Sequence, residues 1–253
     1  MNNIFFALMS IAATAIFISA FSKKIKNVNK YVNGFALIEL FTSEGCSSCP
    51  PADEAINDIQ NEYKNENVVA VGFHVDYWDR LGWKDAFSSP DNTARQEYYS
   101  SIFKLSSIYT PEAVVNGKYE FVGSDKNEIV NTVEEQLKSK PSEIINLNVS
   151  GNSEGNIEVK FSITGNTSAN DQMVLLLVEK AATTNVKRGE NRGRIGHHIN
   201  IVRKMIVTST FSKEGAENFT LPSELKKENA FITAFTQNKK TGAVTGVATA
   251  AIN

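Results

Sequence analysis

The stretch "FTSEGCSSCPPAD", residues 41–53, contains both cysteines of the 253-residue chain, Cys46 and Cys49. Directly before it, residues 35–41 form a short apolar run that predicts a buried strand. The two prolines after Cys49 suit the first turn of a helix, where a missing N–H costs nothing, and apolar residues then recur at helical spacing. The cysteines are therefore expected where a strand leads into a helix N-terminus, a place that stabilises a thiolate at Cys46.

The rest of the first half predicts a parallel strand–helix–strand unit followed by a helix, a hairpin and a last helix. Residues 68–75 form a second apolar run, and a strand, a helix and a strand within about 40 residues make a parallel crossover unit. A helix is expected to begin near Asp91, after Ser-Pro. Asn-Gly at 116–117 predicts a hairpin, and Ser124 or Asp125 can cap the last helix.

The pattern changes after Pro141, where we expect a domain boundary. Apolar residues alternate over 145–149 and over 157–163, as they do in half-buried strands. Further apolar runs bring the expected number of strands to about six, and no long helix is indicated; these runs are residues 174–178, 199–207, 230–235 and 244–251. Residues 142–253 are therefore predicted to form an antiparallel β-sandwich-like domain.

The N-terminus is apolar over residues 4–21, which predicts a signal peptide over residues 1–22 and export of the protein. The residues before this run include no Lys or Arg, and lysines at 23, 24 and 26 follow it. An uncleaved N-terminal membrane anchor is therefore the alternative, and in that case the lysines would favour a cytoplasmic body. Of these alternatives we expect an extracytoplasmic protein, periplasmic or secreted.

Composition narrows the function classes. With 42% hydrophobic and 21% charged residues the chain is globular, and a formal net charge of −2 gives no electrostatic case for a nucleic-acid partner. Haem attachment is excluded because Pro50 follows the second cysteine, and a structural zinc site would need more cysteines than two. No cofactor and no metal are expected; a Cu(I) site using the thiolates and His74 is the alternative.

Several motifs carry a resemblance to known proteins. Residues 34–140, with Cys46-Ser47-Ser48-Cys49 opening the first helix, resemble the thioredoxin fold, and Thr110-Pro111 matches the threonine and cis-proline that this fold places opposite its cysteines. More closely, four stretches are similar to an uncharacterised family of secreted, thioredoxin-like bacterial proteins catalogued as a domain of unknown function: "ELFTSEGCSSCPPAD", "FHVDYWDRLGWKDAFSS", "YTPEAVVNG" and "RGENRGR". The similarity covers nearly the whole chain after residue 34.

The resemblance implies an α/β fold with a thioredoxin-like domain over residues 34–140, followed by the all-β domain over 142–253. It also implies a cis bond before Pro111, which would hold the Thr110 backbone extended so that a client peptide can pair with it. The dipeptide between the cysteines is Ser-Ser instead of the Gly-Pro of thioredoxin, so the resemblance does not fix the redox potential.

These features predict a thiol-disulfide oxidoreductase that acts on a thiol- or disulfide-bearing protein client. Cys46, expected to be the more exposed cysteine, would form the mixed disulfide and Cys49 would resolve it, with Pro111 beside them. The alternative is a non-catalytic thioredoxin-like module that binds copper or a protein partner and keeps a structural disulfide.

Three residues at the end of the second strand or just after it are candidate site residues, and each has two interpretations. His74 ends that strand, where ligands gather in parallel sheets, and it either faces the thiols or is a buried, hydrogen-bonded histidine. Asp76 either moves a proton from Cys49 or orders the loop. Trp78, with neighbouring aromatic residues, either lines a partner groove or packs as a lid.

The stretch "VKRGENRGRIGHHINIVR", residues 186–203, is rich in basic residues. We interpret it as a polar hairpin loop in which Glu190 and Asn191 pair locally with the arginines; an anion or partner site is the alternative. His197 and His198 are adjacent, and adjacent residues on a strand point to opposite faces, so they are weak evidence for a metal site.

Overall fold

The computed structural model describes residues 34–208 and 211–253, and the predicted signal peptide or anchor over residues 1–22 lies outside them. The first half contains β1 (Ala36–Thr42), α2 (Pro50–Glu62), β2 (Val68–His74), η1 (Asp79–Leu81), α3 (Pro90–Phe103), β3 (Glu112–Val115), β4 (Tyr119–Val122) and α4 (Lys126–Leu137). The second half contains β5 (Glu143–Gly151), β6 (Asn156–Gly165), β7 (Asp171–Asn185), β8 (Ile195–Val207), β9 (Glu214–Thr220), η2 (Lys227–Asn229), β10 (Ala230–Asn238) and β11 (Val244–Ala251). Within the described ranges, no helix has the length and apolar character to cross a membrane.

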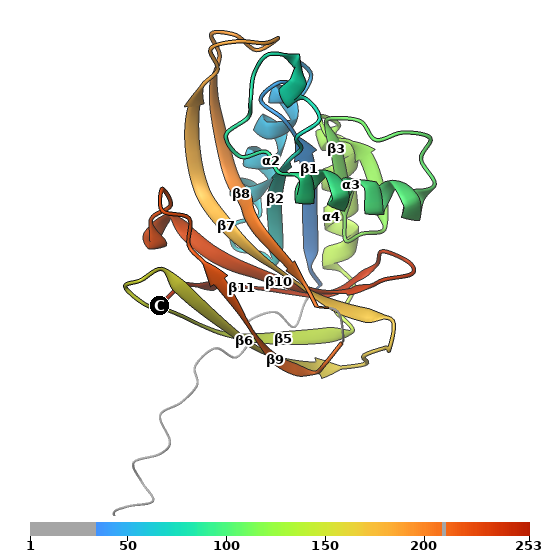
Figure 1. Cartoon of the computed structure of the whole chain (residues 1–253). Helices are drawn as coiled ribbons and strands as arrows, with labels where there is room; N and C mark the ends of the chain where they lie inside the picture. The colour runs from blue at the N-terminus through green and yellow to red at the C-terminus, as the bar shows by residue number, and fades with distance from the viewer. Residues whose placement is uncertain (1–33, 209–210) are drawn as a thin grey trace, which may run out of the picture. The chain divides into compact units, whose positions relative to one another are not determined.

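The fold is mixed α/β and is built on an eight-stranded sheet in the order β11-β10-β7-β8-β2-β1-β3-β4, with a second sheet of order β5-β6-β9 (Figure 1). Strands β1 and β2 are parallel and in register from Ala36 opposite Val68 to Thr42 opposite His74. Their carboxyl ends therefore lie side by side, and this is the edge from which the cysteine-bearing turn leaves β1.

Helices cover both faces of the first-half strands. Ile56 and Ile59 of α2 and Ile129 of α4 pack in one apolar cluster with β1 and β3, whereas Tyr99 of α3 belongs to the cluster on the opposite face. The predicted caps and turns are close to the observed ones. Helix α3 begins at Pro90 after the Ser89 cap, Asp125 caps α4, and residues 116–117 turn the β3–β4 hairpin with the positive φ angles that such a turn requires.

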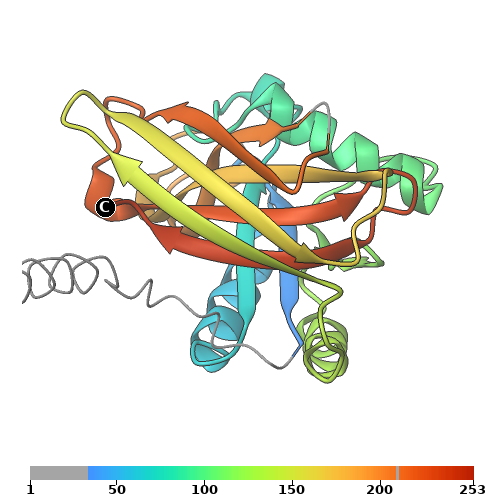
Figure 2. The same ribbon diagram turned by 90° about the horizontal axis from the view of Figure 1, so that it is seen from below.

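The strands of the second half are antiparallel to one another, and the three-stranded sheet packs face to face on part of the large sheet. Figure 2 shows β5, β6 and β9 lying across β7, β10 and β11, and a shared apolar cluster fills the space between them, with Val159 and Phe161 from one sheet and Leu175 and Ile232 from the other. Alternation of inward apolar and outward polar residues along β5 and β6 produces this packing.

The large sheet continues across the expected boundary at residues 141–142. Strand β8 lies parallel to β2, with Gly72 opposite Ile201, and Asn200, at a positive φ of 48°, donates from its side chain to the Ala70 carbonyl at 2.8 Å. One apolar cluster combines Phe73 of β2 with Val202 of β8. The pairing of β2 with β8 is what brings the long β7–β8 hairpin next to the cysteines.

A buried ion pair joins the two halves on the face covered by α3. Glu39, in the middle of β1, accepts from Arg95 Nε at 2.8 Å and from Arg95 Nη2 at 2.9 Å, while Arg95 Nη1 donates to Gln237 of β10 at 2.7 Å. The Tyr99 hydroxyl hydrogen-bonds to Glu39 as well. We call these four residues the Arg95 network. A bidentate arginine–carboxylate pair with every polar atom satisfied is the form in which buried charge is tolerated.

Candidate functional site

Cys46 and Cys49 form a disulfide in the turn between β1 and α2. Cys49 is the N-cap residue of α2, with prolines at the first two helical positions, and its N–H donates to the Cys46 carbonyl at 3.2 Å. The predicted location of the cysteines, where a strand leads into a helix N-terminus, is confirmed.

The prediction that Cys46 is the more exposed cysteine is wrong. Both cysteines have an exposed fraction of 0%, while Ser47 and Ser48 between them are exposed. A helix N-terminus gives access to its leading cysteine only where nothing else covers the turn, and here other segments pack on it.

The tip of the β7–β8 hairpin, residues 186–194, is one of the covering segments. Asn191 donates from its side-chain amide to the carbonyl oxygens of Glu44 at 2.9 Å and Cys46 at 2.8 Å. Glu190 accepts from the Ser47 N–H at 3.2 Å, and Arg194 pairs with Glu54 of α2 at 3.2 Å. The interpretation that Glu190 and Asn191 pair locally with the arginines holds only for the Asn191 carbonyl, which accepts from the Arg194 N–H at 3.0 Å. The side chains of Glu190 and Asn191 hydrogen-bond to the backbone of the cysteine turn instead.

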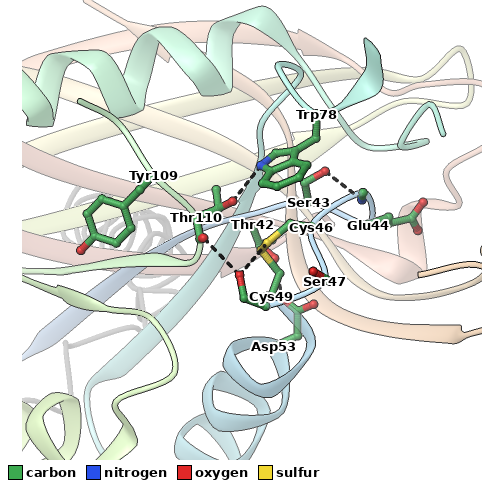
Figure 3. The surroundings of a disulfide bond; sticks show 12 residues. Thr42, Ser43, Glu44, Cys46, Ser47, Cys49, Asp53, Trp78, Tyr109 and Thr110 are labelled. Carbon is green, nitrogen blue, oxygen red and sulfur yellow. Dashed lines mark hydrogen bonds between the residues drawn. A yellow bond between two sulfur atoms is a disulfide. The ribbon is translucent and has the colours of Figure 1, made fainter. Parts of the chain in front are cut away.

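Besides the hairpin tip, Thr110 and Trp78 also lie beside the disulfide (Figure 3). The Ser48 hydroxyl lies 3.3 Å from Cys46 Sγ and donates to the Thr110 carbonyl at 3.4 Å. Trp78 Nε1 donates to Thr110 Oγ1 at 2.8 Å, and the Thr110–Pro111 peptide bond is cis, as the resemblance implied. The sequence thus named two segments, at Trp78 and at Thr110–Pro111, that the fold brings to the cysteines.

His74 is buried and belongs to a group of charges beside the turn. Its Nδ1 lies 2.7 Å from Asp85 Oδ2, and among the described residues no hydrogen bond joins it to either sulfur. Burial lowers the pKa of His74, but the Asp85 carboxylate outweighs burial, so the net shift of that pKa is upward. His74 is therefore the buried, hydrogen-bonded histidine of the second interpretation.

Four more titratable residues surround His74, from the turn after β1, from α2, from the loop after β2 and from β8. We call Glu44, Asp53, His74, Asp85 and His198 the charge cluster. The His198 ring lies edge-on to that of His74, with centroids 4.8 Å apart, and its Nε2 lies 3.2 Å from Glu44 Oε1. Burial raises the pKa of Glu44, while His198, Thr184 and Trp83 beside it lower that pKa by more. Sequence analysis did not select Glu44, Asp53 or Asp85.

Asp53 lies in the first turn of α2, and its carboxylate accepts from the Thr42 hydroxyl at 2.9 Å. Its pKa is raised, because burial of the carboxylate outweighs the attraction of His198 and His74. A pocket of about 80 Å³ opens beside it, lined by residues of the cysteine turn, of α2 and of the β7–β8 hairpin. His197 is exposed whereas His198 is buried, which confirms that the two point to opposite faces.

Metal-binding geometry is not found in this cluster. Within residues 34–208 and 211–253, no group of three or more His, Cys, Asp or Glu side chains is arranged to hold a metal ion. At His198, each ring nitrogen faces a carboxylate, Nε2 that of Glu44 and Nδ1 that of Asp53.

The remaining candidates have structural partners. Asp76 accepts from the Thr93 hydroxyl at 2.6 Å and so connects its loop to α3. Trp83 donates to Glu44 at 2.7 Å, and Tyr77 and Trp78 pack against the apolar cluster beneath the sheet. These contacts agree with an ordered loop and a packed aromatic lid.

The molecule is thus a mixed α/β protein with a buried disulfide at the start of a helix. Residues 37–237 match the family described as Protein of unknown function (DUF1223), and the chain belongs to this family. Its predicted place in a family of unknown function is confirmed.

Two solved structures are similar to this chain. One is a crystal structure of a protein from Agrobacterium tumefaciens, with 24% sequence identity and a TM-score of 0.65; the match covers 86% of this chain and 94% of that one. This similarity shows that the two chains share a fold and shows nothing about activity. The other is a domain of the outer membrane lipoprotein Omp28 from Porphyromonas gingivalis, with 18% identity and a TM-score of 0.30, covering 45% of this chain and 89% of that one. The second likeness is too weak to bear on the fold or function. Comparison with the curated proteins finds no match.

Proposed function

We propose that this protein is a thiol-disulfide oxidoreductase that acts outside the cytoplasm on a thiol- or disulfide-bearing protein client. The observation that carries the proposal is the Cys46–Cys49 disulfide at the N-terminus of α2. Helix N–H groups stabilise negative charge at that position, and a thiolate is the reactive form of cysteine in exchange chemistry.

The proposal includes a thioredoxin-like unit over residues 34–140. The strand order β2-β1-β3-β4, helices on both faces of these strands, and Thr110-Pro111 beside the cysteine turn support it. In this proposal residues 142–253 form an all-β part that contributes the β7–β8 hairpin to the site.

The exchange proceeds in two balanced steps. A client thiolate attacks Cys46 Sγ, the bond between Cys46 and Cys49 breaks, and its electron pair leaves on Cys49 Sγ. A second client thiolate then attacks the client sulfur of the mixed disulfide and releases Cys46 as a thiolate. The client gains a disulfide and the protein gains two thiols, or the reverse when a reduced protein meets an oxidised client.

Burial of both cysteines requires one movement before the first step. The hydrogen bonds of Asn191 to the cysteine turn are the ones that must open, because they fix the hairpin tip over the turn. The extended segment at Thr110 would then be available to a client peptide as a pairing edge.

A second function is favoured by the same burial. A disulfide that no reagent reaches is structural, and the protein would then be a non-catalytic module that binds copper or a protein partner. Titration against defined dithiol buffers separates the two. The exchange function predicts a reversible couple at roughly −120 to −270 mV, and a potential below about −300 mV supports the structural disulfide.

The client and the compartment are part of the proposal. Cys49→Ser leaves Cys46 without a resolving thiol, so in the exporting cell it should accumulate mixed disulfides that a reductant releases, whereas Cys46→Ser should accumulate none.

Export through a signal peptide or anchor over residues 1–22 predicts that a membrane-impermeant thiol reagent labels the reduced protein in whole cells after outer-membrane permeabilisation. Labelling only after lysis would place the body in the cytoplasm and overturn the compartment.

A further inference from the structure

His198 is the least satisfied member of the charge cluster. Its side chain is only 6% exposed, yet neither ring nitrogen has a hydrogen-bond partner among the residues that the structure describes. Nε2 lies 3.2 Å from Glu44 Oε1 and Nδ1 lies 3.8 Å from Asp53 Oδ2, so the ring is held between two carboxylates. A buried polar atom without a partner is costly, and in a native protein it asks for a functional explanation.

The surroundings of His198 are charged on several sides. Glu44 comes from the turn after β1 and Asp53 from α2, while His74 of β2 presents its ring edge at 4.8 Å. Phe87 lies on a further side, with ring centroids 5.7 Å apart. The titratable and charged groups that face or adjoin the ring are therefore Glu44, Asp53, His74 with its partner Asp85, and Arg203, which stacks on the Phe87 ring.

Both carboxylates that flank His198 belong to the segment that bears the cysteines. Glu44 precedes Cys46 by two positions, and the Asp53 N–H donates to the Cys49 carbonyl at 3.1 Å within α2. Figure 3 draws Glu44 and Asp53 among the residues that surround the disulfide, so a charge that appears on a sulfur shares its surroundings with the two carboxylates that flank His198. Histidine is also the side chain whose ordinary pKa makes it change charge near neutral pH.

The cluster has a route to water. The pocket of about 80 Å³ is lined by Glu44, Asp53 and His198, and its lining includes Glu54 and Arg194, which are 74% and 48% exposed. A pocket of this size has room for water molecules, and charged side chains are among its mixed polar and apolar lining. Protons can thus pass between His198 and solvent while the sulfurs stay covered.

We propose that His198 takes up a proton when the disulfide is reduced and so compensates the negative charge released on Cys49. This inference rests on the proposed function. When the client thiolate forms its bond to Cys46 Sγ, the electron pair of the broken bond leaves on Cys49 Sγ. A proton from the acid form of the bulk buffer then reaches a ring nitrogen of His198 through the pocket, and the charge of the imidazolium compensates the negative charge gained at Cys49 Sγ.

The test follows the three histidines of the full chain by NMR through a pH titration, with the disulfide intact and after reduction by a phosphine. His197→Asn and His198→Asn assign the signals. We expect the His198 midpoint to move to higher pH on reduction, with a tenfold or greater rise in proton affinity. The exposed His197 serves as the internal control and should not move, nor should any signal in the Cys46→Ser/Cys49→Ser variant treated with phosphine.

An identical His198 midpoint in the oxidised and reduced chains would overturn the inference. Because a phosphine reduces the disulfide without thiol exchange, this outcome is independent of whether the protein exchanges disulfides with a client. A shifted midpoint in a chain that fails to exchange with dithiols would reject the oxidoreductase and retain the proton coupling. If His198→Asn destabilises the fold, His197→Asn and His74→Asn assign the His198 signal by elimination, and the wild-type titrations then decide the matter.

Discussion

The Arg95 network and the charge cluster are both buried and both contain ionised groups, but they differ in how completely those groups are paired. Arg95 and Glu39 share two hydrogen bonds, and Gln237 and Tyr99 complete the remaining sites. In the charge cluster, and within residues 34–208 and 211–253, the His198 side chain makes no hydrogen bond and the Asp53 side chain makes one, with Thr42. A fully paired network resists any change of charge and so holds a fold together, whereas an incompletely paired one can accept a proton.

Breaking the Arg95 network should have the largest effect. Arg95→Met leaves Glu39 buried without its cation, and we expect a loss of about 3–5 kcal/mol in the free energy of unfolding, measured in urea. The matched control is the double variant Arg95→Met/Glu39→Leu, which removes both charges and should recover most of the loss. A single variant that loses less than about 1 kcal/mol would show that the pair behaves like an exposed ion pair.

The corresponding change in the charge cluster is Asp85→Asn. It removes the carboxylate that His74 and the Glu44 N–H both contact, and we expect a loss of about 2–3 kcal/mol at pH 6. In the folded protein the pKa of His74 is raised, because the attraction of the Asp85 carboxylate outweighs the effect of burial. The pKa of Asp85 is lowered, because the attraction of His74 outweighs burial there as well.

The pair therefore stabilises the fold within a defined pH window. The stabilisation from His74 is complete below about pH 6.5 and is lost as pH rises through its folded pKa. The stabilisation from Asp85 is complete above about pH 4 and is lost as pH falls through its folded pKa. Unfolding free energies measured from pH 2 to 9 should show this maximum in the wild type and a flatter profile in Asp85→Asn. Parallel profiles would show that the cluster does not titrate with folding.

Glu112 sharpens the comparison, because it is a buried carboxyl that is only partly paired. Its Oε2 accepts from Gln96 at 2.6 Å, its Oε1 has no partner in the described part of the chain, and burial raises the pKa of Glu112 to about 7. A raised carboxyl pKa means that stability is highest below the unfolded pKa and falls as pH rises toward 7. Glu112→Gln should remove this fall and be about 2 kcal/mol more stable than the wild type at pH 8, with little difference at pH 4. Equal unfolding curves at both pH values would contradict the raised pKa.

Sequence reasoning located the cysteine turn, because a strand, a Cys-x-x-Cys and two prolines are local signals that act over a few residues. It also anticipated the hairpin at 116–117 and the opposite directions of His197 and His198, which follow from local backbone geometry. Strands β5 and β6 follow from their alternating pattern in the same way, whereas β9, with the sequence EGAENFT, has no such pattern and is a seventh strand beyond the six expected.

What sequence reasoning missed depends on pairing between distant segments. Asn191 hydrogen-bonds to the cysteine turn only because β8 lies beside β2, and a single register pair between those strands sets this. Glu39 looks like an interruption in an apolar strand until Arg95 and Gln237 are brought to it by α3 and β10. Charged residues that satisfy one another across the fold carry no local period that would reveal them.

The smallest expected effect is on the rate of disulfide reduction, which depends on the tip of the β7–β8 hairpin that covers the cysteine turn. Asn191→Ala removes two hydrogen bonds to the cysteine turn, and we expect a loss of about 1 kcal/mol in the energy that holds the hairpin tip closed. Reduction by a small dithiol should then be about fivefold faster, since an opening that costs less is populated more often. The neighbouring, exposed Arg192→Ala is the matched control and should leave the rate unchanged. Equal reduction rates for Asn191→Ala and the wild type would mean that the sulfurs are reached from the side of Ser47 and Ser48, without movement of the hairpin.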